Sequence, residues 1–339
     1  MNRFSYARAA DVPGAVRELA TPRAKVIAGG TNLIDLMKYN VEAPSRLVDI
    51  TRLLGLGDID QVDGGLRIGS LVSNTALATH PEIVERYPLL STTILHGASP
   101  QLRNAASTGG NLLQRTRCYY FYDPATPCNK REPGTGCPAK EGLSRVHAIL
   151  GASDACIATH PSDMCVALAA LAATVQVTGP GGDRTIAFAD FHRLPGDTPW
   201  QDTNLAADEI VTSVTLPADG AAFAGHHTYL KLRDRHSYAF ALVSVAAGLR
   251  MDGDTVAEAR IALGGVAHKP WRDTGAEDLL RGQAPGPEVF GRVADHILRD
   301  AKGYPGNSFK IGLARRAVVR ALQQAAAGTP QPPADKHYQ

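Results

Sequence analysis

Five cysteines lie within one stretch of this 339-residue chain, from Cys118 to Cys165, and the rest of the sequence has none. The part between Cys118 and Cys137 is rich in Pro and Gly and shows neither helical nor strand periodicity. A loop of that length is uncommon in a compact domain unless something organises it. An odd number of thiols in one loop fits metal ligation better than a disulfide framework. The stretch therefore predicts a bound metal or cluster.

Four of these cysteines suffice for either a zinc ion or an iron–sulfur cluster. The paired C-x₂-C knuckles of structural zinc sites are absent, which favours a cluster. Cys118, Cys128 and Cys137 lie in the irregular part, and the fourth ligand is either Cys156 or Cys165. Cys165 begins the apolar segment VALAALAA, where a small buried thiol is common. We therefore predict Cys156 as the fourth ligand and Cys165 as a packing residue.

Two glycine pairs could approach a ligand closely. The first follows a short apolar strand at residues 24–28, and Gly29 and Gly30 precede Thr31, the predicted N-cap of a helix. A helix N-terminus with free N–H groups after such a turn can bind a phosphate. An ordinary strand–helix turn has the same pattern, and the G-x-G-x-x-G fingerprint is absent. The second pair lies in Ser107–Asn111 and is equally weak evidence alone.

Composition excludes several classes of protein. The chain is 44% hydrophobic and 20% charged with a net charge of +2, as in ordinary globular proteins, and it favours neither nucleic acid nor an anionic membrane. We see no membrane-spanning apolar run and no signal peptide. The length predicts two or three domains.

Helices and strands alternate along the chain. A helix capped by Asp11 follows a strand near residue 5, and further strands are expected at 45–50, 65–70, 184–192 and 209–218. A buried helix from residue 164 should lead into a strand. Beyond a break at 217–225, strands flank the Asp252-Gly253 turn, helices follow at 276–281, 287–301 and 309–327, and the tail should be disordered.

Four segments together carry a resemblance to a known family: VIAGGTNLIDLM, ASTGGNL, HPSDMCVALAAL and LKLRDRHSYAFALVSVA. In content, order and spacing they resemble the FAD-binding subunit of the xanthine dehydrogenase and molybdenum hydroxylase family, over about residues 4–325. The extra cysteine loop is most similar to that of the flavin subunits of periplasmic aldehyde oxidoreductases, in which the loop carries a [4Fe–4S] cluster. The segment ACIAT around Cys156 matches a family cysteine.

The resemblance implies an α+β fold of the vanillyl-alcohol-oxidase/PCMH type, with two subdomains that clamp FAD. The FAD-binding domain would span residues 1–218, with the cluster loop inserted at about 115–158. A C-terminal domain like that of CO dehydrogenase flavoproteins would span 225–327, and residues 328–339 would form the tail.

The resemblance also implies partners. A large subunit would hold the molybdenum cofactor, a small subunit would hold [2Fe–2S] clusters, and this chain would pass electrons through FAD to an external acceptor. No residue of this chain would act on the substrate itself. The relatives are exported folded, which implies the periplasm, with the cytoplasm as the alternative.

Individual residues receive roles from the same resemblance. Asp163 would face the ribityl or adenosine side of FAD, or would only cap a helix. Lys231 would lie near the isoalloxazine ring, or would be a solvated strand lysine. The cluster ligands would be Cys118, Cys128, Cys137 and Cys156. The FAD contacts would be Val26, Ile27, Ala28, Gly29, Gly30, Thr31, Asn32, Leu33, Thr108, Gly110, Asn111, Asp163 and Lys231.

Two other functions compete with this one: a stand-alone FAD-dependent oxidase, and a zinc-stapled scaffold. The charged and imidazole side chains do not separate them. Arg115 and Arg117 could offset a cluster's negative charge or be solvated. A basic face that includes Lys310 is expected to be solvated. Loop or surface positions are expected for five histidines, which lack zinc-protease spacing: His147, His160, His226, His227 and His236.

Overall fold

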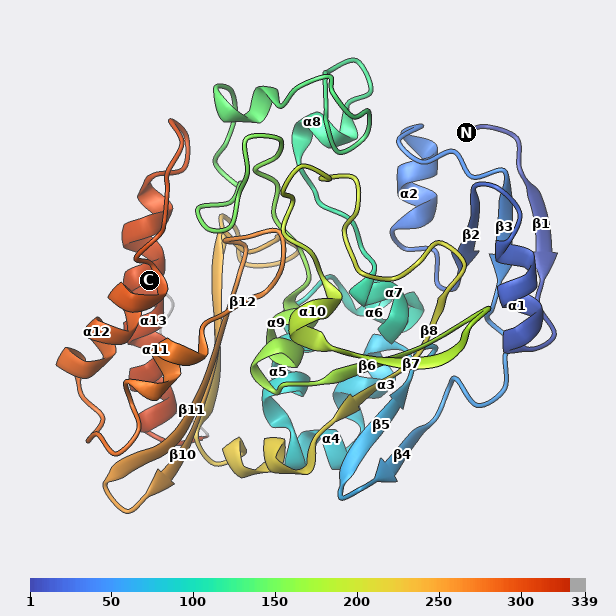
Figure 1. Ribbon diagram of the computed structural model, residues 1–339. Helices are drawn as coiled ribbons and strands as arrows, with labels where there is room; N and C mark the ends of the chain where they lie inside the picture. Colours follow the sequence, from blue (N-terminus) through green and yellow to red (C-terminus); the bar gives the residue numbers. More distant parts are fainter. Residues whose placement is uncertain (330–339) are drawn as a thin grey trace.

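Three β-sheets organise residues 1–329, the part of the chain that the computed structural model describes (Figure 1). The mixture of helices and strands confirms the predicted α+β class. Residues 330–339, which make up most of the predicted tail, lie outside the described residues. Within residues 1–329, no helix is long and apolar enough to cross a membrane.

The first sheet is parallel, in the order β1-β3-β2, and comprises β1 (Ser5–Arg8), β2 (Ala24–Ile27) and β3 (Arg46–Asp49). Helix α1 (Val12–Leu19) begins after Asp11, whose carboxylate accepts a hydrogen bond from the Gly14 N–H at 2.6 Å, as predicted. Its apolar face buries Ala15, Val16 and Leu19 against this sheet. Helix α2 (Leu33–Lys38) connects β2 to β3.

The second sheet has the order β4-β5-β8-β6-β7 and is antiparallel. Its strands are β4 (Ile59–Val62), β5 (Gly65–Gly69), β6 (Thr174–Gly179), β7 (Gly182–Ala187) and β8 (Ile210–Leu216). The helices of this unit are α3 (Asn74–Thr79), α4 (Pro81–Arg86), α5 (Pro88–Leu95), α6 (Pro100–Ala105), α7 (Thr108–Leu112), α9 (Asp163–Ala170) and α10 (Phe188–Phe191).

The predicted strand at 184–192 is correct only in its first half. Strand β7 ends at Ala187, which pairs with Thr174, the first residue of β6, so a longer strand would have no partner there. The chain turns into α10 instead, and this brings Phe188 and Phe191 into the core. Tertiary pairing therefore overrides the strand-like composition of this segment.

The third sheet is antiparallel, in the order β12-β11-β10-β9, and comprises β9 (His227–Leu232), β10 (Val243–Asp252), β11 (Thr255–Gly264) and β12 (Trp271–Arg272). The β10–β11 hairpin turns at Gly253, as predicted, and the positive φ of 55° there suits glycine. The 3₁₀ helix η2 (Ala218–Phe223) occupies the predicted break, but whether residues 1–218 and 225–327 are separate domains stays a prediction.

Three helices follow the third sheet: α11 (Thr274–Asp278), α12 (Pro287–Ile297) and α13 (Phe309–Ala326). The last two pack on one face of the sheet, at the left of Figure 1. The expectation that Lys310 is solvated is wrong. Its ammonium group is buried, and it donates to the backbone carbonyls of His147 at 2.8 Å and Gly265 at 2.6 Å. These hydrogen bonds replace those that water would make.

Helix α9 lies between the second and third sheets, and all of its residues are buried (Figure 1). It packs against α5 on one side and against β10 and β11 on the other. Alanines at 167, 169 and 170 let these elements approach closely. The prediction of a buried helix here that leads into a strand is confirmed.

A buried ion pair fixes the N-terminal end of α9 to the third sheet. The Lys231 ammonium on β9 donates to Asp163 Oδ2 at 2.8 Å, and the Tyr229 hydroxyl donates to Asp163 Oδ1 at 2.5 Å. The Lys231 side chain is 1% exposed and that of Asp163 is 9% exposed. Both alternatives considered for these residues are wrong: Ser162, not Asp163, caps the helix, and Lys231 is not solvated.

Replacing Lys231 with Met should lower the free energy of unfolding by about 3–5 kcal/mol, because it leaves the buried Asp163 carboxylate unpaired. Urea unfolding measures this change. The exposed pair Lys140–Asp154 provides the control, and Lys140→Met should cost less than about 1 kcal/mol. The double variant Lys231→Met/Asp163→Asn should recover part of the loss. Equal, small effects of Lys231→Met and Lys140→Met would contradict this account.

Candidate functional site

A cleft of about 1280 Å³ opens between the first sheet and the second. One wall consists of β2, the following loop and α2, and includes every residue from Val26 to Leu33. The opposite wall is formed by Ser107, Gly109 and Gly110 with the segment from Trp200 to Val211. Both predicted glycine turns therefore border the cleft.

The first glycine pair brings the two walls together. A side chain at Gly29 would lie 1.8 Å from the backbone oxygen of Ala105 at the end of α6. At Gly30 the φ angle is +70°, a conformation that favours glycine. Gly29 is thus required by a backbone contact within the protein, whether or not a ligand is bound.

The predicted cap of α2 is wrong by one residue. Asn32, not Thr31, occupies the N-cap position, and its side chain makes no capping bond. Instead, Asn32 Oδ1 accepts the backbone N–H of Arg115 at 2.9 Å. The Ile34 N–H of the first turn donates to the Gly30 carbonyl at 3.1 Å, and the Thr31 side chain beside it is exposed.

The second glycine pair lies in a short helix, α7, rather than in a β-turn. Ser107 caps it by accepting the Gly110 N–H at 3.3 Å. The Thr108 hydroxyl donates to the Val72 carbonyl at 2.9 Å and is buried away from the cleft. Asn111 Oδ1 accepts from the Ser162 hydroxyl at 2.6 Å. Of the predicted contacts on this turn, only Gly110 lines the cleft.

Asp163 and Lys231 also lie outside the residues that line the cleft. Their charges neutralise each other in the pair described above. A direct contact of either residue with a flavin stays a prediction.

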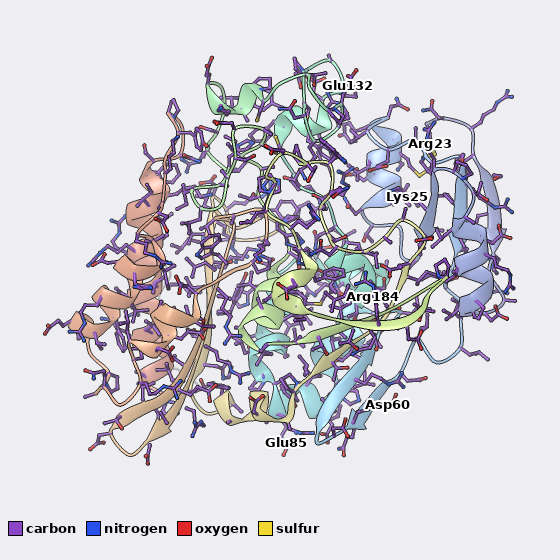
Figure 2. All side chains as sticks on the ribbon, viewed as in Figure 1. Arg23, Lys25, Asp60, Glu85, Glu132 and Arg184 are labelled. Carbon is purple, nitrogen blue, oxygen red and sulfur yellow. The ribbon has the colours of Figure 1, made fainter. Side chains whose placement is uncertain are left out.

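Several cleft residues were not predicted. Arg23 and Lys25 place cations at the cleft beside β2, where Figure 2 labels them. Asp202 and Arg193 lie on the opposite wall. Cations near glycine turns could have been suspected from the sequence, but nothing in the spacing of residues 193–211 pointed to this wall.

A second, small cavity is enclosed by the cysteine segment, which includes the helical turns α8 (Tyr119–Tyr122) and η1 (Pro138–Lys140). Its lining contains Cys118, Cys128, Cys137 and Cys156. Cys165 does not line it. The structure thus brings together the four thiols that were selected as ligands, across 38 residues of sequence from 118 to 156.

The thiols of this cavity differ in acidity. Burial raises the pKa of Cys118 to about 12. A hydrogen bond from the Cys156 thiol lowers the pKa of Cys137 below that of a free thiol. His147 Nε2 lies 3.1 Å from Cys118 Sγ, and this histidine, expected at a loop or surface position, lies in a loop but is buried. Binding of a metal would displace the remaining thiol protons.

The cysteine cavity and the cleft share a wall. Leu36 of α2 lines the cleft and also packs in the cluster of Cys118, Cys128 and Cys156. Tyr122 donates to Asp35 of the same helix at 3.2 Å. Helix α2 therefore packs against the cysteine segment and also lines the cleft.

Charged residues also connect the lining of the cleft to that of the cysteine cavity. Arg115 donates to Asp202 Oδ2 at 2.8 Å and to Glu42 Oε1 at 2.5 Å. Lys130, whose side chain is 1% exposed, donates to Asp202 Oδ1 at 2.5 Å and also lines the cysteine cavity. Solvation of Arg115, which was one alternative, is therefore wrong: Arg115 is largely buried and paired.

Comparisons with known proteins agree with this geometry. Residues 2–219 match the model of the FAD binding domain in molybdopterin dehydrogenase, and residues 227–325 match the CO dehydrogenase flavoprotein C-terminal domain. The chain is 50% identical to the aldehyde oxidoreductase FAD-binding subunit PaoB of Escherichia coli over 330 residues, with 96% of this chain and 99% of that one covered.

More distant relatives are also similar over nearly the whole chain, at lower identity. The medium subunit of nicotine 6-hydroxylase from Paenarthrobacter nicotinovorans is 26% identical over 96% of this chain and 98% of its own length. The structure of carbon monoxide dehydrogenase from Hydrogenophaga pseudoflava contains a chain that superposes with a TM-score of 0.75 at 26% identity, covering 96% of this chain and 98% of that one. The chain therefore belongs to the FAD-binding subunits of the xanthine dehydrogenase and CO dehydrogenase family of oxidoreductases.

Proposed function

We propose that this chain is the FAD- and [4Fe–4S]-binding electron-transfer subunit of a heterotrimeric molybdenum-containing aldehyde oxidoreductase. Its partners would be a molybdenum-cofactor subunit and a small [2Fe–2S] subunit, and its FAD would pass electrons to an external acceptor. The 50% identity to an aldehyde oxidoreductase subunit supports the class of substrate. The same resemblance makes the periplasm the proposed compartment.

The observation that carries the proposal is the shared wall between the cleft and the cysteine cavity. When bound, FAD supplies one- and two-electron chemistry, and a cluster supplies one-electron transfer. Leu36 and the Arg115–Asp202–Lys130 chain would hold the two groups side by side and exclude water from between them. The buried positive charge of Lys130 would partly offset a negatively charged cluster.

The spacing of the sulfur atoms bears on the zinc alternative. A single zinc ion needs four sulfurs at about 2.3 Å, which places them roughly 4 Å from one another. Within residues 1–329, one group of three or more histidine, cysteine or acidic side chains has all its donor atoms within 4.8 Å of one another. None of the four cysteines belongs to this group. Cys137 and Cys156 are in hydrogen-bond contact, but no three of the four thiols are mutually this close, which favours a cluster over a single ion.

The wall of the cleft offers a test of FAD binding that does not disturb the Gly29 contact. Gly110→Val places two methyl groups at the cleft, where only Ser107 Oγ lies within 4 Å of the new Cβ. The flavin content of the purified protein should fall about tenfold or more, because backbone approach to the diphosphate is blocked. Gly57→Val, at an exposed glycine with open space around it, is the matched control. Full flavin occupancy in folded Gly110→Val would place the diphosphate elsewhere.

The cluster assignment predicts opposite outcomes for two cysteines. Cys156→Ser should lose most of its iron, or retain a cluster that oxygen destroys, because one of four ligands is replaced. Cys165→Ala should keep near-full iron, since its sulfur lies outside the cavity. Iron analysis and the visible spectrum of the purified variants measure this. The reverse pattern would make Cys165 the fourth ligand, and a colourless wild-type protein with zinc would favour the scaffold.

Division of labour between subunits is testable with the chain alone. The purified chain, freed of the other subunits, should not oxidise aldehydes, whereas the complete complex should. Aldehyde turnover by this chain alone would instead support the stand-alone oxidase.

A further inference from the structure

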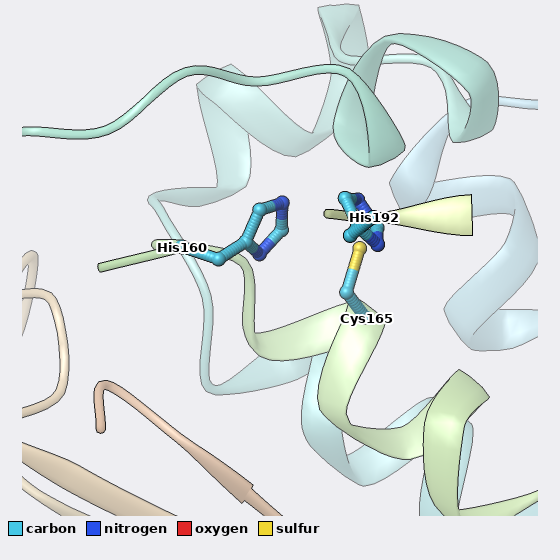
Figure 3. A group of neighbouring side chains, drawn as sticks. All are labelled: His160, Cys165 and His192. Carbon is cyan, nitrogen blue, oxygen red and sulfur yellow. The ribbon is translucent and has the colours of Figure 1, made fainter. Parts of the chain in front are cut away.

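A third group of metal-binding side chains lies apart from both sites: His160, Cys165 and His192 (Figure 3). They come from the segment before α9, from α9 itself and from the end of α10. Their donor atoms all lie within 4.8 Å of one another, and all three residues are buried. No other such group occurs in residues 1–329, and none of the three lines the cleft or the cysteine cavity.

Both imidazoles have a buried ring nitrogen without a partner. These are His160 Nε2 and His192 Nδ1. Leaving a buried polar atom unpaired costs about 1–3 kcal/mol, so each such atom calls for an explanation. His160 lies in a loop, one of the two expected positions, but it is not at the surface: its ring is buried and lies 4.3 Å, centroid to centroid, from that of His192.

The second nitrogen of each ring has a hydrogen-bond partner, and this leaves the unpartnered nitrogen as the ligand atom. His192 Nε2 lies 2.9 Å from the Leu112 carbonyl, to which it can donate a proton, and this leaves Nδ1 as the free ligand atom. The Ser162 backbone N–H donates to His160 Nδ1 at 3.4 Å, and Nε2 is the ring nitrogen of His160 without a partner. Such second contacts of ligating histidines orient the ring towards a metal.

We propose that His160, Cys165 and His192 bind one thiophilic d¹⁰ metal ion, Zn²⁺ or Cu⁺. Two imidazoles and one thiolate are a donor set that both ions accept. On binding, the Cys165 thiol would release its proton to solvent as the metal–sulfur bond forms. Because the site is fully enclosed, the ion would enter while the chain folds.

The ion would have a structural role for the cleft. It would tie α9 and α10 together beneath α7, because His192 contacts Leu112 at the end of α7. Ser162, between His160 and Cys165, already donates to Asn111 of α7 at 2.6 Å. Metal at this point would therefore stabilise the helix that carries Gly110 into the cleft. The proposal does not depend on the cluster or on the partner subunits.

Metal analysis of the purified full-length chain tests the proposal. Cells are grown with added zinc in one culture and added copper in another, and the metal identified decides between the two ions. We expect about one zinc or copper ion per chain in the wild type, and about a tenfold loss in both Cys165→Ala and His192→Ala. His227→Asn, which alters a buried imidazole elsewhere, should retain the metal.

Folding and the cluster are followed in the same samples. Cys165→Ala should keep its iron and most of its flavin while it loses zinc or copper, which separates this site from the cysteine cavity. X-ray absorption at the zinc or copper edge should show one sulfur and two nitrogen ligands. A flavin-loaded wild type without either metal, metal retained in both variants, or a shell of four sulfurs would each overturn the proposal.

Discussion

The buried carboxylate of Asp163 links helix α9 to the third sheet, and the relative position of the second and third sheets depends on this link. It lies at the first turn of α9 and receives Lys231 and Tyr229 from β9, so the helix and the third sheet are held by charge as well as by packing. A carboxylate in this position is tolerated only because the lysine is present. Since α9 also packs on α5, this pair fixes the third sheet relative to the unit that carries the cleft.

A second constraint is the close approach of Gly29 to the Ala105 carbonyl. It seals the first sheet against α6, so the cleft has two rigid walls. Helix α2 follows directly, and its Leu36 lines the cleft and packs in the cluster that contains Cys118, Cys128 and Cys156. One short helix thus contributes both to the lining of the cleft and to the packing around the cysteines.

Polar side-chain networks behind the two walls of the cleft also hold its surrounding segments in place. Asp202 joins Arg115 to Lys130, and Ser162 joins α9 to α7. The burial of these groups explains why the segment from residue 113 to 162 keeps a defined shape with little regular secondary structure. Backbone groups in such a segment need partners, and side chains such as Asn129, Arg131 and Asn307 supply them.

The sequence by itself determined the local features. Gly30 needs a positive φ, Asp11 caps a helix, and alternating or periodic apolar residues define most of the strands and helices, because these depend on neighbours within a few residues. The crowding of cysteines also predicts a metal site in this loop, and this stays a prediction. Only the tertiary structure decided the pairing of Asp163 with Lys231, of Arg115 with Asp202, and of His160 with His192. Their partners lie 68, 87 and 32 residues away in the chain, and burial, which no local pattern reports, turns solvated charges and surface histidines into paired or enclosed groups.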